Sequence, residues 1–266
     1  MPRLTQPAAI RRLLATDRPW AIYALGDLAP GFFERCEWFA APGDEPGLAL
    51  LYRAFATPVL FTQGRPSAVR QVLDEIGPQP EMYLSIRPVI LPLVRERHDV
   101  DEPISMWRMA LEPGDFRPVG AAGAVRLGVA ALQAVRALYA DGEDLGQSPD
   151  FFSGDMLEQG VFFGIWEAET LIAVAGTHLV SPQDSVGAVG NVYTRRDRRG
   201  RGLAAAVTGA VTGELVSMGL RTIGLNVNQQ NAAAMRVYER LGYQKYCPFV
   251  EGMAFAKVPA PVESRL

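Results

Sequence analysis

The sequence predicts an α/β fold made of two successive units. Helix-like and strand-like apolar patterns alternate along the whole chain, as is typical of α/β proteins. A chain of 266 residues is long enough for two domains of ordinary size. A segment rich in Pro, Gly and Ala, residues 113–122, separates two such alternating stretches. We therefore expect a domain over residues 1–112, a linker over 113–122 and a second domain over 123–266.

In the first half, apolar spacing and chain breakers define each element. Ala9, Ile10, Leu13 and Leu14 share one face of a helix, and Gly77-Pro78 ends a later one. The expected helices are 5–16, 18–30, 68–76 and 88–96, and the expected strands are 32–40, 48–54, 59–62, 83–86 and 106–111. The turn at Gly64–Ser67 starts a helix but lacks the glycine spacing of a phosphate-binding loop.

The second half repeats this rhythm with longer strands. Val161–Trp166 and Leu171–Val180 form a hairpin across Glu167–Thr170. The remaining expected strands are 124–127, 186–194, 225–228, 243–247 and 253–258, and the expected helices are 129–140, 149–159, 203–218 and a short helix that carries Tyr238. A tight turn at Pro248 is expected between the last two strands, and the final ESRL is expected to fray.

Composition excludes several classes of function. The net charge of -3 does not favour a partner such as nucleic acid or an anionic membrane. No apolar run approaches the ~18 residues of a membrane span, and the N-terminus lacks the features of a secretory signal. Two isolated cysteines favour free thiols in a reducing cytoplasm. Only His98 and His178 are histidines, and neither lies in a metal-like cluster, so no metal is expected.

The stretch Asn191–Tyr243 carries the clearest functional pattern. Arg199-Gly200-Arg201-Gly202-Leu203-Ala204 fits [QR]-x-x-G-x-[GA] between a strand and a helix. The two glycines remove Cβ atoms where a pyrophosphate would approach the backbone. The N–H groups of residues 200–205 would face that ligand at the positive end of the helix. Further arginines at 195, 196 and 198 would add a cationic rim.

This stretch resembles the acyl-coenzyme-A motif of the GNAT N-acetyltransferase superfamily. Besides Arg199–Ala204, the resemblance includes the strand Leu225-Asn226-Val227 and the run Asn231-x-x-Ala234-x-x-x-Tyr238 before Leu241-Gly242-Tyr243. It implies two GNAT-like units in tandem, each a mixed, mostly antiparallel sheet flanked by helices. Thr57–Leu60 and Gly64–Val69 give the first half a similarity to the glycine N-acyltransferase-like branch.

The resemblance also implies roles for residues of the donor site. Val192, Tyr193 and Thr194 would diverge from the next strand and pair with the amides of pantetheine. The N–H of Val192 or its neighbour would polarise the thioester carbonyl. Tyr238 would protonate the leaving thiolate. The set expected to bind acetyl-CoA is Val192, Tyr193, Thr194, Arg199, Gly200, Arg201, Gly202, Leu203, Ala204, Ala205, Asn228, Asn231 and Tyr238.

The base that takes the proton of the acceptor amine stays open. Many GNAT enzymes carry a Glu on the strand before the arginine motif, but Val186–Asn191 contains no carboxylate. His178 is one candidate, Asn191 could position a water, and the glycines of this strand could leave space for a substrate. Other carboxylates to consider are Asp155, Glu158 and Glu167.

These features predict an acyl-CoA-dependent N-acyltransferase. It would move an acetyl group from acetyl-CoA to the amine of a small molecule or amino acid in a direct ternary complex. The alternative is a non-catalytic protein that binds or senses acyl-CoA, which the missing strand carboxylate motivates. Either protein would act as a monomer or homodimer.

Overall fold

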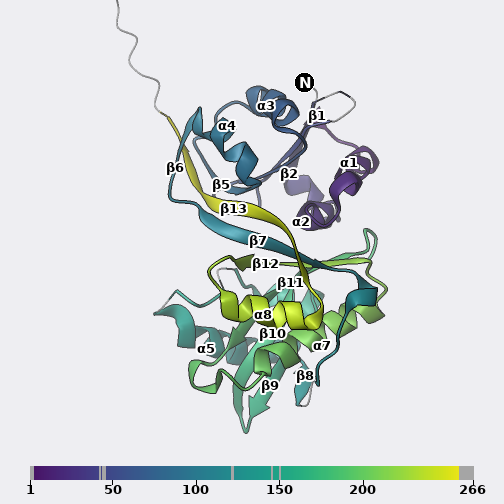
Figure 1. Cartoon of the computed structure of the whole chain (residues 1–266), viewed down its shortest axis with the longest axis vertical. Coiled ribbons are helices and arrows are strands. Elements are labelled where there is room, and N and C mark those ends of the chain that lie inside the picture. Colours follow the sequence, from purple (N-terminus) through teal and green to yellow (C-terminus); the bar gives the residue numbers. More distant parts are fainter. Residues whose placement is uncertain are drawn as a thin grey trace, which may run out of the picture. The chain divides into compact units, whose positions relative to one another are not determined.

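The computed structural model describes residues 3–41, 43, 46–120, 123–144, 146–149 and 151–257 (Figure 1). They form two compact units. Unit 1 comprises the described residues of Met1–Asp17, Pro30–Met106 and Pro248–Leu266, and unit 2 comprises those of Arg18–Ala29 and Trp107–Cys247. Among the described helices, none is both long and apolar enough to cross a membrane.

The two units are not continuous in sequence. The predicted limits at residues 112 and 123 place Arg18–Ala29 in the first half, yet this segment packs within unit 2. Likewise, Pro248 and the residues after it pack within unit 1. The domain limits predicted from the linker composition therefore differ from those of the compact units. Two short segments pack within the unit whose other residues are distant from them in sequence.

Unit 1 begins with short helices and continues with a strand meander. Its helical elements are α1 (Pro7–Leu14), η1 (Ala15–Asp17), η2 (Phe33–Arg35), α3 (Pro66–Ile76), η3 (Pro88–Ile90) and α4 (Leu91–Arg95). Its strands are β1 (Arg3–Leu4), β2 (Cys36–Ala40), β3 (Leu48–Tyr52), β4 (Val59–Gln63), β5 (Glu81–Ile86) and β6 (His98–Val100). Part of β7 (Ile104–Leu111) and most of β13 (Gln244–Ala256) also lie in unit 1.

The sheet of unit 1 is mixed and mostly antiparallel. Its strand order is β1-β2-β3-β4-β5-β13, and β6 pairs with β13 on the side away from β5. Strands β4 and β5 are parallel, with Val59 opposite Tyr83 and Phe61 opposite Ser85. Helix α3 makes the crossover between them, because parallel neighbours cannot be joined by a tight turn. Apolar residues of α3 and α4, such as Val72 and Val94, close the core on this sheet.

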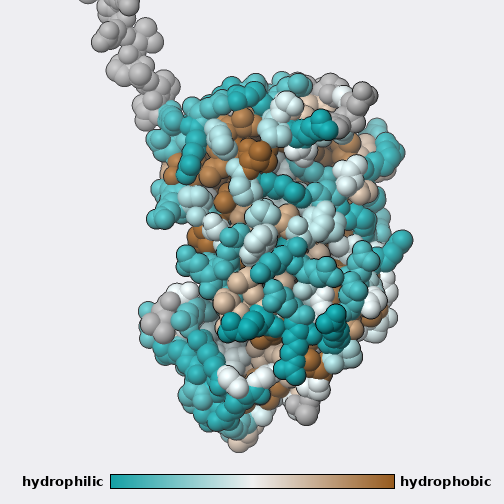
Figure 2. Space-filling model, viewed as in Figure 1, coloured by the Kyte–Doolittle hydropathy of each residue, from teal (hydrophilic) through white to brown (hydrophobic). Residues whose placement is uncertain are grey.

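The surface of unit 1 includes an apolar hollow near α3 and α4, where Figure 2 shows a brown patch. Its lining includes Leu73, Ile76, Met82 and Leu93. Arg97, which also lines the hollow, is bound to Asp74, and Arg70 on α3 is bound to Glu96. Such a hollow suits apolar contacts rather than phosphate groups.

Unit 2 contains longer strands and the longest helix. Its helical elements are α2 (Ile22–Gly26), η4 (Pro113–Asp115), η5 (Val129–Ala131), α5 (Leu132–Glu143), α6 (Gly154–Gln159), η6 (Arg196–Arg198), α7 (Leu203–Ser217) and α8 (Ala232–Leu241). Its strands are β8 (Ala124–Arg126), β9 (Phe163–Glu167), β10 (Thr170–Ser181), β11 (Val186–Thr194) and β12 (Thr222–Asn228), with the remainder of β7 and β13.

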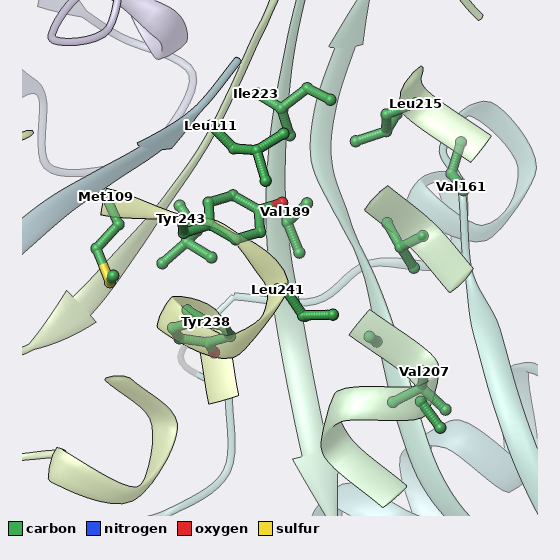
Figure 3. Close-up of a cluster of buried hydrophobic side chains, with 14 of the residues drawn as sticks. Met109, Leu111, Val161, Val189, Val207, Leu215, Ile223, Tyr238, Leu241 and Tyr243 are labelled. Carbon is green, nitrogen blue, oxygen red and sulfur yellow. The ribbon is translucent and has the colours of Figure 1, made fainter. Parts of the chain in front are cut away.

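The sheet of unit 2 follows the same plan. Strands β8, β9, β10 and β11 are antiparallel neighbours, whereas β11 and β12 are parallel and joined through α7. One apolar cluster joins the sheet to α7 and α8, including Val207 and Leu241 (Figure 3). A second cluster joins the sheet to α5 and α6 through Leu138 and Leu157. Helices therefore flank the sheet, and the predicted fold of two GNAT-like α/β units is confirmed in this respect.

Some predicted elements differ from the structure. Strand β13 runs through Pro248 without the expected turn, because the fixed φ of proline is compatible with an extended chain. The expected helix over 18–30 is the short α2, and part of the expected strand over 32–40 is the 3₁₀ turn η2. The prediction for the ESRL tail and for Val258 lies outside the described residues.

Candidate functional site

The parallel pair of β11 and β12 separates beyond its first four residues. Pairing joins Val186–Val189 to Thr222–Leu225 and ends there, while β11 continues beside β10 as far as Thr194. The strand ends Val192–Thr194 and Asn226–Asn228 are thus not joined in this ladder. Separated strand ends leave backbone groups that an extended ligand can bind.

A β-bulge lies where the two strands separate. Gly190 is opposite Gly176 and Tyr193 is opposite Val174, so β11 has one more residue than β10 between these pairs. Asn191 within the bulge has φ 53°, which is unusual for a residue with a Cβ. Its carbonyl accepts a hydrogen bond of 2.9 Å from the buried Tyr139 hydroxyl. This hydrogen bond stabilises the bulge, and the bulge sets the direction of the backbone in the residues after Asn191.

The turn before α7 is open. Gly200 and Gly202 have φ of 79° and 78°, a region that favours glycine, and a Cβ on either would meet no atom within 4 Å. Among the described residues no side chain caps the helix, which begins at Leu203. The first N–H bonded in the helix at this end is that of Ala206, which reaches Gly202 O at 3.1 Å. The N–H groups of Leu203, Ala204 and Ala205 are therefore the orphan donors of the first turn.

The arginines around this turn do not form a uniform cationic rim. Arg195 contacts Asp197, and Arg198 contacts Glu167 at 2.6 Å. Arg196 contacts Asp141 and Asp144. Arg199 donates to Thr194 O and to Gln147 Oε1, and its guanidinium lies over the Tyr193 ring.

Arg201 has the weakest of these contacts. Its guanidinium is 3.8 Å from Glu167, and its side chain is 57% exposed. Among the arginines of this turn, Arg201 would therefore lose the least interaction energy if its side chain turned toward a ligand. Arg199, in contrast, joins the end of β11 to the loop after α5, which sequence spacing did not reveal.

Tyr238 is buried where α8 packs on the sheet. Its ring is 6.2 Å from that of Tyr243 in an edge-to-face arrangement, and burial raises its pKa to about 12 (Figure 3). The phenol is therefore protonated at neutral pH. A second and smaller cause of the raised pKa is the charge of Tyr23, which places the two phenols within electrostatic range.

The two asparagines near α8 shape the backbone. Asn231 Oδ1 accepts from Ala234 N at 3.0 Å and caps the helix, and Asn228 Oδ1 accepts from Gln230 N at 2.8 Å. Any contact of Asn231 with a ligand must therefore use its amide NH₂ or replace the cap.

His178 lies on a second bulge, in β10. Thr177 is opposite Val189 and Leu179 is opposite Ala188, so His178 is the extra residue. A Cβ on Gly190 would overlap the imidazole, and Nε2 is the ring atom nearest to it. Gly190 therefore makes room for His178 and not for a substrate, while a Cβ on Gly187 would meet Leu220 and Leu215.

The surroundings of His178 keep its imidazole neutral. Its Nδ1 lies 2.9 Å from the Tyr23 hydroxyl, and burial and then the charge of Arg108 lower its pKa to about 4. The Arg108 side chain is only 1% exposed, with its guanidinium 4.6 Å from the centre of the Tyr23 ring and 5.3 Å from that of Trp20. Tyr23, Arg108 and His178 come from α2, β7 and β10, and Trp20 lies just before α2, all of them in unit 2.

Comparisons with known proteins relate part of the sequence to one family model and the fold to acetyltransferases of known structure. Residues 163–250 match the family model of FR47-like proteins. A GCN5-related N-acetyltransferase of Kribbella flavida superposes with a TM-score of 0.62 at 18% identity, covering 91% of this chain and 95% of that one. A GNAT family protein of Novosphingobium aromaticivorans gives 0.61 at 22%, covering 91% and 100%.

The chain has the fold of GNAT proteins. A tandem GNAT protein from the clavulanic acid biosynthesis pathway also has this fold, with a TM-score of 0.54 at 13% identity and coverage of 97% and 98%. This likeness over both halves fits the two-unit organisation. The similarity to the glycine N-acyltransferase-like branch stays a prediction.

Two sequence relatives are both mycothiol acetyltransferases. Mycothiol acetyltransferase of Actinosynnema mirum is 35% identical over 111 residues, which are 41% of this chain and 35% of that protein. The enzyme of Geodermatophilus obscurus is 35% identical over 89 residues, 32% of this chain and 29% of that protein. The matches thus span about a third of the length of these curated relatives.

The sequence did not point to Tyr23, Asp27 or Arg108 as residues near the candidate site. Burial raises the pKa of Asp27 to about 7, although its side chain keeps some exposed surface. Tyr23 is 155 residues from His178 in sequence, and its helix lies beyond the predicted domain limit. The sequence predicted a helix over residues 18–30 from its apolar pattern. It did not predict that Tyr23 on this helix contacts His178.

The other carboxylates considered as a base lie elsewhere. Asp155 and Glu158 are exposed on α6, and Glu167 is engaged with Arg198 and Arg201. Among the described residues, no group of three metal-ligating side chains gathers at one place.

Proposed function

We propose that this protein is an acyl-CoA-dependent N-acyltransferase that moves an acetyl group from acetyl-CoA to a small-molecule amine. The carrying observation is the open turn of Gly200 and Gly202 at the N-terminus of α7. It lies after a strand whose end has separated from its parallel neighbour. A site for phosphates thus adjoins a site for an extended amide-containing arm.

The donor half uses mainly backbone groups. The N–H groups of residues 200–205 would hold the pyrophosphate, with Arg201 adding charge at the rim. The backbone of Val192–Thr194 would pair with pantetheine, and the N–H of Val192 or its neighbour would polarise the thioester carbonyl. Asn228 and Asn231 would line the arm near α8.

Direct transfer needs one proton donor and one proton acceptor. The amine nitrogen attacks the thioester carbon, the C–S bond breaks, and Tyr238 gives its phenolic proton to the leaving thiolate. With a pKa of about 12, Tyr238 keeps this proton throughout the neutral range. His178 would accept the proton released by the nitrogen, because it is neutral and no carboxylate occupies β11.

Calorimetric titration with acetyl-CoA tests the donor site. We expect binding by the parent, and a loss of at least ~100-fold in affinity for Gly202→Glu, because the new carboxylate would occupy the anion site. Gly219→Glu is the matched control, since Gly219 also has φ of 78° with no atom within 4 Å and lies at the other end of α7. Equal affinity for the parent and Gly202→Glu would contradict the proposal.

Thiol release over a panel of small amines and amino acids tests catalysis. We expect release by the parent and a loss of about 10-fold or more for Tyr238→Phe. Binding of acetyl-CoA without release for any amine would favour the alternative, a non-catalytic acyl-CoA sensor. A filter-binding series with nucleic acid should show no affinity. The cytoplasmic location and the monomer or homodimer state stay predictions.

A further inference from the structure

Helix α2 belongs to the same unit as the proposed acyl-transfer site, although in sequence it lies between β1 and β2 of unit 1. The segment Arg18–Ala29 packs within unit 2. It is anchored there by Arg18, which donates to Asp184 O at 2.6 Å, and by Ile22, which fills the space that a side chain on Gly224 would need. Sequence position gives no hint of this arrangement.

We propose that Tyr23 is a positioning residue of the acyl-transfer site, which holds the His178 imidazole as the proton acceptor. The inference rests on the proposed function. Its direct support is the 2.9 Å contact between Tyr23 Oη and His178 Nδ1, with the two rings tilted and 5.9 Å apart. A second support is the bulge that makes His178 an extra residue of β10.

The geometry directs one nitrogen of the ring toward β11. Since Nδ1 faces Tyr23, Nε2 is the atom closest to the backbone at Gly190. Gly190 directly precedes the bulge at Asn191 and Val192, where the proposed thioester site begins. The imidazole thus occupies the space that a side chain at Gly190 of β11 would fill. In this arrangement His178 on β10 serves as the base in place of a carboxylate on β11.

The contact with the Tyr23 hydroxyl is compatible with the reactive tautomer, because a phenol oxygen can accept a hydrogen bond as well as donate one. When Nδ1 carries the proton and donates it to Tyr23 Oη, the Nε2 lone pair is available. The amine nitrogen forms its bond to the carbonyl carbon and releases one proton to Nε2, while the thiolate takes one proton from Tyr238. Exchange with solvent returns the proton from His178 and restores the Tyr238 phenol, so the protons balance.

The charges around His178 fit a neutral amine as the acceptor. Arg108 faces Tyr23 from β7 and acts on His178, β11 presents the bare backbone of Gly190, and Asp27 follows Tyr23 by one helical turn. Tyr238 from α8 is within electrostatic range of Tyr23. A weak base suffices, because the nitrogen becomes strongly acidic once its lone pair has formed the new bond.

Nitrogen-15 NMR of the imidazoles tests the contact without any turnover. The chain has two histidines, and His98 in unit 1 serves as the internal reference, with its Nε2 at 3.0 Å from Gln79 O. Tyr23→Phe should move the His178 Nδ1 signal and its titration midpoint and leave the His98 signals unchanged. Tyr52→Phe, in unit 1, is the matched control and should move neither. Unchanged His178 signals in Tyr23→Phe would overturn the inference.

Kinetics test the positioning role. Tyr23→Phe keeps the ring and should lower kcat about 10-fold with KM for acetyl-CoA within about twofold, whereas His178→Gln should lower kcat about 100-fold. The double variant should be no slower than His178→Gln, because the two residues act as one unit. The kcat/KM of the parent should rise with pH according to the pKa of the acceptor amine, without a step near 6.5.

The outcomes separate this inference from the proposed function. An active parent with an equally active Tyr23→Phe variant, or losses that multiply in the double variant, would overturn the role of Tyr23 alone. A parent that does not bind acetyl-CoA would overturn the proposed function instead.

Discussion

The two units both contain a strand, a glycine-containing turn and a helix, followed by a parallel strand, but the turn is closed in unit 1 and open in unit 2. In unit 1, β4 leads through Gly64 to α3, which has Pro66 at its first position. A Cβ on Gly47 would lie 2.5 Å from Ala68 O, and one on Gly64 would lie 2.8 Å from Pro46 O. The segment before β3 therefore packs against the start of α3.

In unit 2, a Cβ at the equivalent positions before α7 would meet no atom of the described residues within 4 Å. Gly200 and Gly202 need glycine for their positive φ, not for close packing. Glycine before a helix therefore has two different uses in this protein. In unit 1 it allows close approach of the protein's own backbone, and in unit 2 it leaves the backbone uncovered, as the proposed anion site requires.

The largest expected effect concerns the closed turn. Gly47→Ala should lower the free energy of unfolding by about 3 kcal/mol, because the new methyl group would overlap the rigid backbone of Ala68 and Val69. Gly200→Ala should cost only about 1 kcal/mol, the strain of a positive φ. Urea titrations of both variants measure the difference. Similar losses would show that the two turns do not differ in packing.

The pH dependence of stability should differ between the parent and a variant of unit 2. The pKa of His178 is lowered to about 4 from 6.5, so between these values the unfolded chain binds a proton that the folded chain does not. The parent should therefore lose about 2 kcal/mol of stability, relative to His178→Asn, as the pH falls from 7 to 4. Urea titrations at a series of pH values measure this difference. A constant difference across the range would contradict the burial of the imidazole.

Charge reversal should weaken ligand binding at one helix only. Arg201→Glu should reduce the affinity for acetyl-CoA about 10-fold, because a carboxylate would replace a cation beside the pyrophosphate. Arg65→Glu, at the closed end of α3, should leave the affinity unchanged. Calorimetric titration of the two variants compares the ends, and an equal loss for Arg65→Glu would indicate a second site in unit 1.

The smallest expected effect separates two neighbouring arginines. Arg199→Ala should lower the free energy of unfolding by about 1 kcal/mol, since it removes the hydrogen bonds to Thr194 and Gln147. Arg201→Ala should leave stability within about 0.5 kcal/mol and weaken acetyl-CoA binding a few-fold. Thermal unfolding and titration of both variants test this split, which the reverse pattern would contradict.

Much of the geometry of the proposed donor half could be predicted from the sequence, because its signals are local. The pattern Arg199–Ala204 fixes a glycine turn at a helix start within six residues, and that turn is where the sequence places it. The periodicity of apolar residues likewise predicted α7 and α3. These features depend on backbone dihedrals and helix ends, which neighbouring residues determine.

The structure gave different partners to several residues that the sequence had singled out. The space beside Gly190 holds His178, most of the expected arginine rim is paired within the chain, and Asn231 caps α8. A sequence shows that a residue can form such contacts. It does not show which of the possible partners the fold brings into contact with that residue.

By itself, the sequence of this protein determined the α/β class, the open turn before α7 and the position of Tyr238. Only the tertiary structure decided that Tyr23 meets His178, that Arg18–Ala29 joins unit 2, and that the turn before α3 is closed. The physical reason is range: turn and helix geometry follows from adjacent residues, whereas these contacts form only when packing joins segments far apart in the chain.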